Sequence, residues 1–150
     1  MDKIIDLKNE EFFIPQYVDL RNSYVDLLLT LPVNINNTRE WLKKTEIEVR
    51  GIVRDNILFG AAILYLDKGG EIAFFVREQN KGFGGRLLNA IEMVAIERGL
   101  KSVWAWVLDY NYIAQKVFEK NGYVREKIAP QKVYNKKNCR GVIFRKRLRK

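Results

Sequence analysis

The spacing of apolar residues predicts helices in the first third of the chain. Within residues 10–31 the apolar side chains recur at helical intervals, as on the buried stripe of one or two helices. Asn37 and Glu40 have the spacing of a capping box, which predicts a second short helix that continues through Leu42. A short strand over residues 3–7 is expected before these helices.

The pattern then changes to the alternation of strands. Residues 47–53 alternate between apolar and other side chains, and residues 57–66 and 71–76 continue the pattern after two turns. Asp55-Asn56 and Lys68-Gly69-Gly70 are typical turn sequences. These three segments predict an antiparallel meander joined by hairpin connections.

The second half of the chain predicts a strand–helix–strand unit. A glycine-rich loop follows Val76 and leads into a helix that Gly99 ends. The nearly continuous apolar run 103–108 is typical of a strand covered on both faces. Because the strands before and after this helix are expected to be parallel, their connection should be right-handed.

A further helix over residues 111–121 ends at Gly122, and segments 123–127 and 141–147 are expected to pair as a terminal hairpin. The predicted fold class is therefore α+β, with one domain over residues 1–150. Its central sheet is expected to be mixed but mostly antiparallel, with helices on both faces.

Composition adds a bias toward anionic partners. The formal net charge is +9, and residues 145–150 form one dense basic run. Such a charge suits nucleic acid, a membrane surface or an anionic small molecule. No apolar run approaches the roughly 20 residues that span a bilayer, and the first residues lack the apolar core of a signal peptide. We therefore expect a cytoplasmic protein without a membrane partner.

The absence of histidine removes many chemistries. With no histidine and one cysteine, a Ser-His-Asp or Cys-His relay cannot form, and a metal cofactor is not expected. Cys139 lies in a polar, loop-like segment and is interpreted as incidental. A catalytic base would have to be Asp, Glu, Lys, Tyr, a terminus or water.

The glycine-rich loop is the clearest chemical signal. Gly82, Gly84 and Gly85 stand between a predicted strand and a predicted helix N-terminus. Glycine permits positive φ and close approach of a ligand, and the first N–H groups of a helix attract phosphate oxygens. Lys81 and Arg86 add positive charge. The segment therefore predicts a phosphate or pyrophosphate cradle.

Two common phosphate loops do not match this segment. The dinucleotide fingerprint requires a third glycine where Leu87 stands. The mononucleotide loop requires Gly-Lys-Ser/Thr, which is absent.

The segment Gln79-Asn80-Lys81-Gly82-Phe83-Gly84 instead resembles the Gln/Arg-x-x-Gly-x-Gly motif of the GNAT superfamily of N-acetyltransferases. That family places the motif after its fourth strand, at the start of a long helix. Downstream, Asn111, Ala114, Gly122 and Tyr123 match the spacing of a second family motif. The resemblance covers residues 47–127 well and the N-terminal third loosely.

The resemblance implies direct transfer of an acetyl group from acetyl-CoA to an amine, without a covalent enzyme intermediate. Glu71 opens the fourth strand, where some members carry a glutamate base, although a simple ion pair with a lysine is the alternative. The resemblance implies the following cofactor-binding residues: Phe75, Val76, Gln79, Asn80, Lys81, Gly82, Phe83, Gly84, Gly85, Arg86, Asn111 and Phe118.

The sequence departs from the family pattern at two points. Phe118 stands where many members have a tyrosine that protonates the departing thiolate, so that acid is missing. Tyr112 or Tyr123 is a possible substitute. The link between the fourth strand and the glycines is also a little short, which affects the choice of Phe75 and Val76 as the contacts to the pantetheine arm.

The acceptor is less defined. Residues around Arg21 and Trp41 resemble the N-terminal helices of members that acetylate ribosomal-protein N-termini or nucleotide-linked amino sugars. Arg21 is thus a candidate acceptor-site residue, with a structural ion pair as the alternative, and Trp41 is expected in the core. An acyl-CoA binder without transfer and a basic nucleic-acid-binding module remain competing functions. The protein is expected to be a monomer or homodimer.

Overall fold

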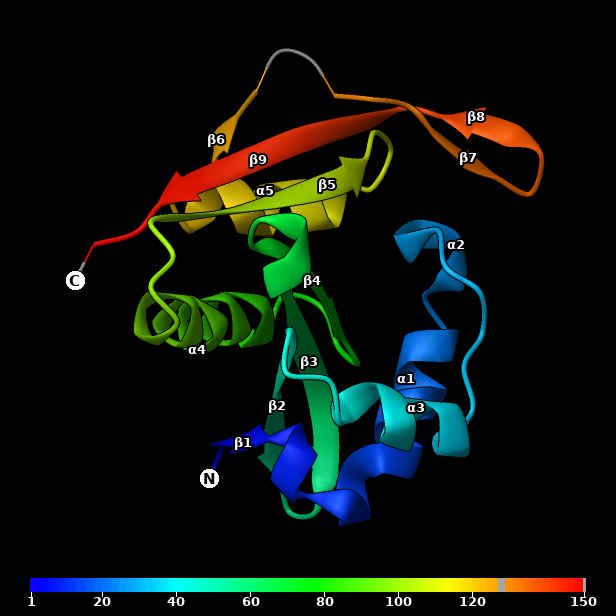
Figure 1. Ribbon diagram of the computed structural model, residues 1–150, viewed down its shortest axis with the longest axis vertical. Helices are drawn as coiled ribbons and strands as arrows, with labels where there is room; N and C mark the ends of the chain where they lie inside the picture. The colour runs from blue at the N-terminus through cyan, green and yellow to red at the C-terminus, as the bar shows by residue number, and fades with distance from the viewer. Residues whose placement is uncertain (127–128, 150) are drawn as a thin grey trace.

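A seven-stranded sheet forms the centre of the computed structural model, which describes residues 1–126 and 129–149 (Figure 1). The strand order is β1-β2-β3-β4-β5-β9-β6. Every neighbouring pair is antiparallel except β4 and β5, which are parallel. The expected mixed, mostly antiparallel α+β architecture is confirmed. The strands are β1 (Lys3–Asp6), β2 (Ile47–Arg54), β3 (Ile57–Tyr65), β4 (Glu71–Val76), β5 (Ser102–Leu108), β6 (Val124–Arg125) and β9 (Gly141–Arg147).

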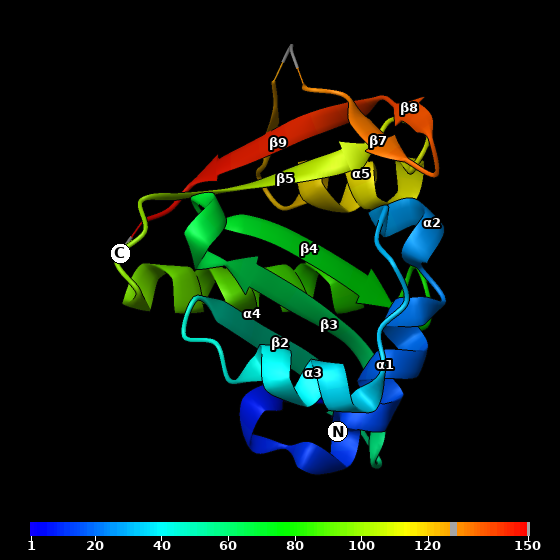
Figure 2. The same cartoon turned by 45° about the vertical axis from the view of Figure 1, so that its right-hand side comes forward.

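Helices cover both faces of the sheet, as predicted. On one face, α1 (Ile14–Asn22) and α3 (Ile35–Leu42) pack over a buried cluster that includes Tyr17 and Val49. On the other face, α4 (Phe83–Glu97) and α5 (Tyr112–Lys120) cover a second cluster that includes Leu88 and Phe144. Figure 2 shows α4 behind the sheet and α1 and α3 in front of it.

The predicted helical region 10–31 is divided into three pieces. A 3-10 turn, η2 (Glu11–Phe13), leads into α1, and a short helix, α2 (Val25–Leu28), follows. Two further 3-10 turns are η1 (Leu7–Asn9) and η3 (Leu66–Lys68). The chain leaves α2 through Leu29, whose φ of 55° is left-handed.

The predicted capping box at Asn37 and Glu40 is wrong. The helix α3 begins at Ile35, and its N-cap is Asn34, whose side-chain oxygen accepts a hydrogen bond from the Asn37 N–H at 2.7 Å. Asn37 therefore supplies one of the free N–H groups of the first turn rather than the cap. Asparagine stands at positions 34, 36 and 37, so residue type alone did not distinguish the two possible helix starts.

The terminal hairpin is confirmed in part. Strands β6 and β9 pair antiparallel, with Val124 opposite Arg145. The predicted strand 123–127 ends at residue 127, which lies outside the described residues. The connection between β6 and β9 contains a second small sheet that the sequence reasoning missed, made of β7 (Lys132–Tyr134) and β8 (Lys137–Cys139). Cys139 thus lies in a strand and not in a loop.

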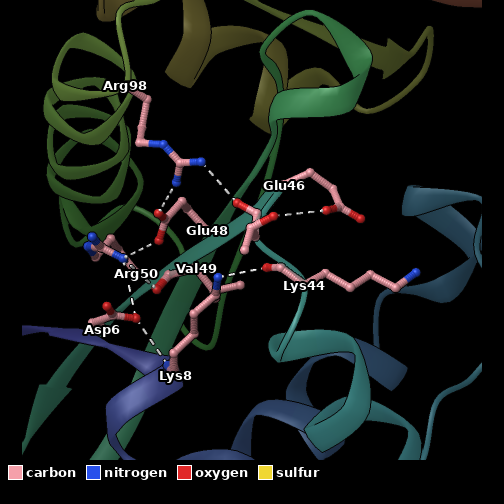
Figure 3. A network of polar contacts seen from close by, with 9 residues as sticks. Asp6, Lys8, Lys44, Glu46, Glu48, Val49, Arg50 and Arg98 are labelled. Carbon is pink, nitrogen blue, oxygen red and sulfur yellow. Dashed lines mark hydrogen bonds and ion pairs between the residues drawn. The ribbon is translucent and has the colours of Figure 1, made fainter.

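A network of charged side chains fixes the C-terminal end of α4 on β2 (Figure 3). The guanidinium of Arg98 donates to the Glu48 carboxylate at 2.5 Å and to the carbonyl of Thr45 at 3.0 Å. Arg50 lies 3.3 Å from Glu48 and 3.4 Å from Asp6. The network therefore links α4, β2 and the end of β1.

The strands β4 and β5 diverge from a single contact. Only Glu71 and Trp104 are paired across them. Figure 2 shows the strands close at one end and apart at the other, with α2 beside the open end. Because both strands start together and separate toward their C-terminal ends, the sheet contains a wedge-shaped gap at its centre.

Replacing the observed N-cap of α3 should test its assignment. We expect Asn34→Ala to lower the free energy of unfolding by about 1 kcal/mol, because one N–H of the first turn loses its acceptor. Asn37→Ala should change it by less than about 0.5 kcal/mol, since this exposed side chain makes no cap. Urea unfolding of both variants gives the comparison, and a larger loss for Asn37→Ala would restore the capping-box assignment.

Candidate functional site

Two cavities meet in the gap between β4 and β5. The first, which we call the loop cavity, has a volume of ≈ 500 Å³ and is formed by residues 74–76, the loop 78–85 and one face of α5. The second, which we call the wedge cavity, has a volume of ≈ 200 Å³ and lies among residues 71–74, 105–107, 27–30 and Arg21. The residues that line both are Leu27, Leu28, Phe74, Asn111 and Ala114.

The loop cavity faces the N-terminus of α4. Gly82 is the N-cap, with a φ of 78° and no side-chain capping bond, so the first N–H groups of the helix are left for another acceptor. A Cβ atom placed on Gly82 would meet nothing within 4 Å, which shows open space in front of the helix end. The helix dipole makes this space attractive to an anion.

Lysine side chains strengthen this preference. Lys81 lies in the loop, and Lys116 and Lys120 reach the loop cavity from α5, whereas Glu78 is the one carboxylate among the lining residues. Lys116 and Lys120 were missed by the sequence reasoning. They are four residues apart on a predicted helix, so helical spacing placed them on one face, but nothing in the sequence showed that this face lies opposite the glycine loop.

Most of the predicted cofactor residues are brought together in the loop cavity. The predicted residues that line it are Phe75, Val76, Gln79, Asn80, Lys81, Gly82, Phe83, Gly84, Gly85 and Asn111. Asn111 also caps α5, since its side-chain oxygen accepts from the Ala114 N–H at 3.3 Å. The two interpretations of Asn111, as cap and as lining residue, are therefore compatible.

Arg86 lies apart from the loop cavity. Its guanidinium pairs with Asp2, which also binds Arg54 at 2.5 Å. Arg86 is one turn into α4, and its side chain points toward the end of the sheet formed by β1 and β2. The arginine pair, led by Arg54, lowers the pKa of Asp2 to about 2.

The peptide groups of β4 face alternate edges of the strand. The Arg77 N–H donates to the Phe59 carbonyl on β3 at 2.6 Å, so residues at odd positions of this segment direct their backbone groups toward β3. The predicted contact Phe75 is one of these, and its ring is buried against Tyr17 and Tyr24. The backbone groups of Val76, the other predicted contact, are directed toward the gap. Those of Phe74, which the sequence reasoning missed, have the same direction.

Phe118 lies at the base of the wedge cavity and is 2% exposed. Its ring packs against Phe74, Tyr123 and Phe144, with centroid distances of 5.2, 4.9 and 5.7 Å. Phe118 therefore presents an aromatic ring to the wedge cavity and supplies no hydroxyl group there.

The two tyrosines considered as substitutes line neither cavity. Tyr112 is 67% exposed. The Tyr123 hydroxyl donates to the buried Glu92 carboxylate at 2.8 Å, and burial together with this carboxylate raises the pKa of Tyr123. A tyrosine that does line the loop cavity is Tyr24, whose hydroxyl donates to the carbonyl of Val76 at 2.5 Å.

Glu71 lies in the wedge cavity with a side chain that is 15% exposed. Its carboxylate is 3.8 Å from the ammonium group of Lys132, so the ion pair expected as the alternative is present as well. Lys132 also lies over the Trp106 ring, 4.5 Å from its centroid. A partly buried carboxylate at this position can accept a proton from a group bound in the cavity.

Arg21 lines the same cavity from α1. Within residues 1–126 and 129–149 it makes no ion pair, and its Nη1 atom is buried without a hydrogen-bond partner. Burial raises the pKa of Tyr17 and of Tyr65, and Arg21 partly opposes this rise through its charge and through its side-chain N–H groups, which lie near both hydroxyl groups. Trp41 stacks on Tyr17 at 6.3 Å and packs against the core as expected.

The sequence matches the model of the acetyltransferase (GNAT) family over residues 6–123. The match spans most of the chain, and the protein belongs to this family. It is therefore an enzyme of the acetyltransferase class. No curated protein matches the sequence at a significant level.

Solved structures share the fold at low sequence identity. A ribosomal-protein-alanine N-acetyltransferase from Brucella melitensis is similar with a TM-score of 0.84, 18% identity and coverage of 97% of this chain and 99% of that chain. A Salmonella typhimurium protein, solved with its cofactor acetyl-CoA, is similar with a TM-score of 0.82 and 16% identity, over 99% of this chain and 94% of that chain. A Salmonella typhimurium acetyltransferase that modifies the N-terminal serine of ribosomal protein L7/L12 is similar with a TM-score of 0.78 and 15% identity, over 99% of this chain and 95% of that chain.

The described residues contain neither a metal-binding cluster nor a membrane-spanning helix. No cluster of three or more His, Cys, Asp or Glu side chains there is arranged to hold a metal ion. None of the helices in the same part of the chain has both the length and the apolar character needed to span a membrane.

The position of Arg86 predicts an acid titration. The Asp2 carboxylate should titrate with a midpoint near pH 2 in the folded protein, against about 3.9 for an unperturbed aspartate. Because the folded-state pKa is depressed, the stabilising pairing is complete above about pH 4 and is lost as the pH falls toward 2. Carbon-detected NMR measures the midpoint. Arg86→Gln should move it upward, and a wild-type midpoint near pH 4 would contradict the pairing.

Proposed function

We propose that this enzyme transfers the acetyl group of acetyl-CoA directly to a primary amine of a small molecule or of a peptide N-terminus. The observation that supports the proposal is the meeting of the loop cavity and the wedge cavity at Phe74 and Asn111. One cavity is built for an anion, and the other contains a carboxylate. Two substrates that enter from opposite sides can therefore react at the junction.

The pyrophosphate of acetyl-CoA would lie at the N-terminus of α4. The free N–H groups after Gly82 and the three lysines of the loop cavity provide hydrogen bonds and positive charge for it. The pantetheine arm would then run along the gap, where β4 lacks a partner strand beyond Glu71. Its amide groups can pair with the backbone groups of Phe74 and with the Val76 N–H, which lack a strand partner on this edge, whereas the Val76 carbonyl already accepts a hydrogen bond from Tyr24.

The chemistry needs few protein groups. The amine nitrogen attacks the thioester carbon, a C–N bond forms, and the C–S bond breaks as the thiolate leaves. The amine proton passes to Glu71 or to water. A backbone N–H of β4 that faces the gap stabilises the negative charge on the thioester oxygen. Holding both reactants in line at the junction supplies much of the remaining rate.

The thiolate can leave without the missing tyrosine. A thiol with a pKa near that of cysteine, about 8.5, is a fair leaving group even when no acid assists it. With Phe118 the site lacks one proton donor, but the transfer can still proceed.

The cytoplasmic location and the monomeric or dimeric state stay predictions.

Substitution of Glu71 tests its role as the base. We expect Glu71→Gln to lower kcat by about 10²- to 10⁴-fold, the range of general base catalysis, with acetyl-CoA binding retained. The control is Glu126→Gln, because Glu126 is also paired with a basic residue, Arg145 at 3.1 Å, but lies outside both cavities. Release of free thiol over a panel of amines measures the rates. Equal rates for Glu71→Gln and the wild type would assign the proton transfer to water.

Thermal unfolding with acetyl-CoA, together with the thiol-release assay, tests the alternative of acyl-CoA binding without transfer. Acetyl-CoA that stabilises the fold but is not consumed with any amine would favour the binder. Turnover with at least one amine class would exclude it.

The two ends of α4 offer a matched pair of glycines. Gly82 has a φ of 78° and Gly99 a φ of 82°, and a Cβ atom at either would meet nothing within 4 Å. Alanine should therefore cause a similar loss of stability at both, on the order of 1 kcal/mol. Only Gly82→Ala should weaken acetyl-CoA binding, because only Gly82 shapes the loop cavity. Calorimetric titration gives the affinities. An equal loss of acetyl-CoA affinity in Gly99→Ala would contradict a role of the loop in binding.

A further inference from the structure

Three buried polar atoms in the described part of the chain have no hydrogen-bond partner, and they cluster around the wedge cavity. They are Arg21 Nη1, the Thr30 hydroxyl oxygen and the Tyr17 hydroxyl oxygen. Arg21 and Thr30 line the wedge cavity, and Tyr17 lies beside Arg21 in the small pocket behind it. Buried polar groups in native proteins are almost always paired, so these atoms are available to a bound ligand or to ordered water.

Arg21 differs from the two lysines of this cavity in its surroundings. Lys132 pairs with Glu71, and Lys68 lies 4.6 Å from the centroid of the Tyr65 ring. Arg21 has neither an ion pair nor a ring contact within residues 1–126 and 129–149. A guanidinium keeps its charge even when buried, and the neutral hydroxyls of Tyr17 and Tyr65 do not balance that charge, whereas an anion that enters with the ligand would.

We propose that the acceptor is a small amine that carries a carboxylate, as in a free amino acid, and that Arg21 binds this carboxylate. The inference rests on the proposed acetyl transfer and names the class of acceptor. The planar fork of arginine matches a carboxylate with two parallel hydrogen bonds. The volume of ≈ 200 Å³ suits a small molecule, since cavities for drug-sized ligands begin at about 300 Å³.

The placement also orients the reacting amine. The carboxylate would lie at Arg21 on the α1 side of the wedge cavity, while Glu71 lies on the β4 side. An amino group near Glu71 and the junction can then lose its proton and meet the thioester. Arg21 thus acts as a binding and positioning residue and takes no part in proton transfer.

The test uses matched acceptors. Each of the standard L-amino acids is compared with its C-terminal amide, which keeps the amine and the side chain but removes the negative charge. For the acids that are acetylated, we expect kcat/KM to exceed that of the amide by roughly 10- to 100-fold, the range of a charged hydrogen-bond pair. Amides that react as well as the acids would overturn the proposal.

Variants connect the preference to Arg21. Arg21→Met keeps the alkyl chain, and we expect it to bring the ratio of acid to amide close to one while acetyl-CoA stabilises it as much as the wild type. Arg125→Met, on the exposed strand β6, is the matched control and should keep the wild-type ratio. A ratio that persists in Arg21→Met would refute the assignment.

Stability distinguishes a binding role from a structural one. Because Arg21 makes no ion pair among the described residues and its Nη1 atom is unpaired, Arg21→Met should leave the Tm unchanged or raise it by a few degrees. A clear fall in Tm would show a structural ion pair and would count against the proposal. If acetyl-CoA stabilises the protein but no amino acid is acetylated, the acceptor class is wrong. If acetyl-CoA has no effect on Tm, the proposed function itself fails.

Discussion

The single pairing of Glu71 with Trp104 is the constraint on which the arrangement depends. A parallel pair that continued along β4 and β5 would close the sheet and satisfy its own backbone. Divergence instead leaves one edge of β4 without a strand partner, and buried backbone groups need partners. The gap is therefore suited to an extended, amide-containing ligand such as the pantetheine arm. The helices α4 and α5 then bring positive charge to the gap from one face of the sheet, while residues of α1 line the wedge cavity and residues of α2 line both cavities.

Much of this arrangement could be predicted from local sequence. Alternation and turn residues located the meander, since Asp55 and Asn56 both adopt the left-handed conformation that a tight hairpin needs. The glycines predicted a helix that begins at the loop, and Asn111 and Gly122 marked the two ends of α5. These elements were predictable because turn geometry and helix ends are determined by a few adjacent residues.

The remaining features depend on contacts between distant residues. Arg86 pairs with Asp2, 84 residues away in the sequence, so its charge lies apart from the loop that it follows. Whether Phe74 or Phe75 directs its backbone groups toward the gap depends on the register of β4 against β3. Lys116 and Lys120 became lining residues only when α5 was placed opposite the loop. The small sheet of β7 and β8 escaped prediction because each strand has only 3 residues, too few to show an alternating pattern.

The central claim is that the loop cavity and the adjoining gap bind acetyl-CoA. Thermal unfolding with and without acetyl-CoA tests this claim most directly. A ligand at 100 times its dissociation constant stabilises a fold by roughly 2.7 kcal/mol, which for a chain of this size raises Tm by about 5–10 °C. Such a rise with acetyl-CoA, and a much smaller one with a nucleotide that lacks the pantetheine arm, is the predicted result. An unchanged Tm at millimolar acetyl-CoA would contradict the account.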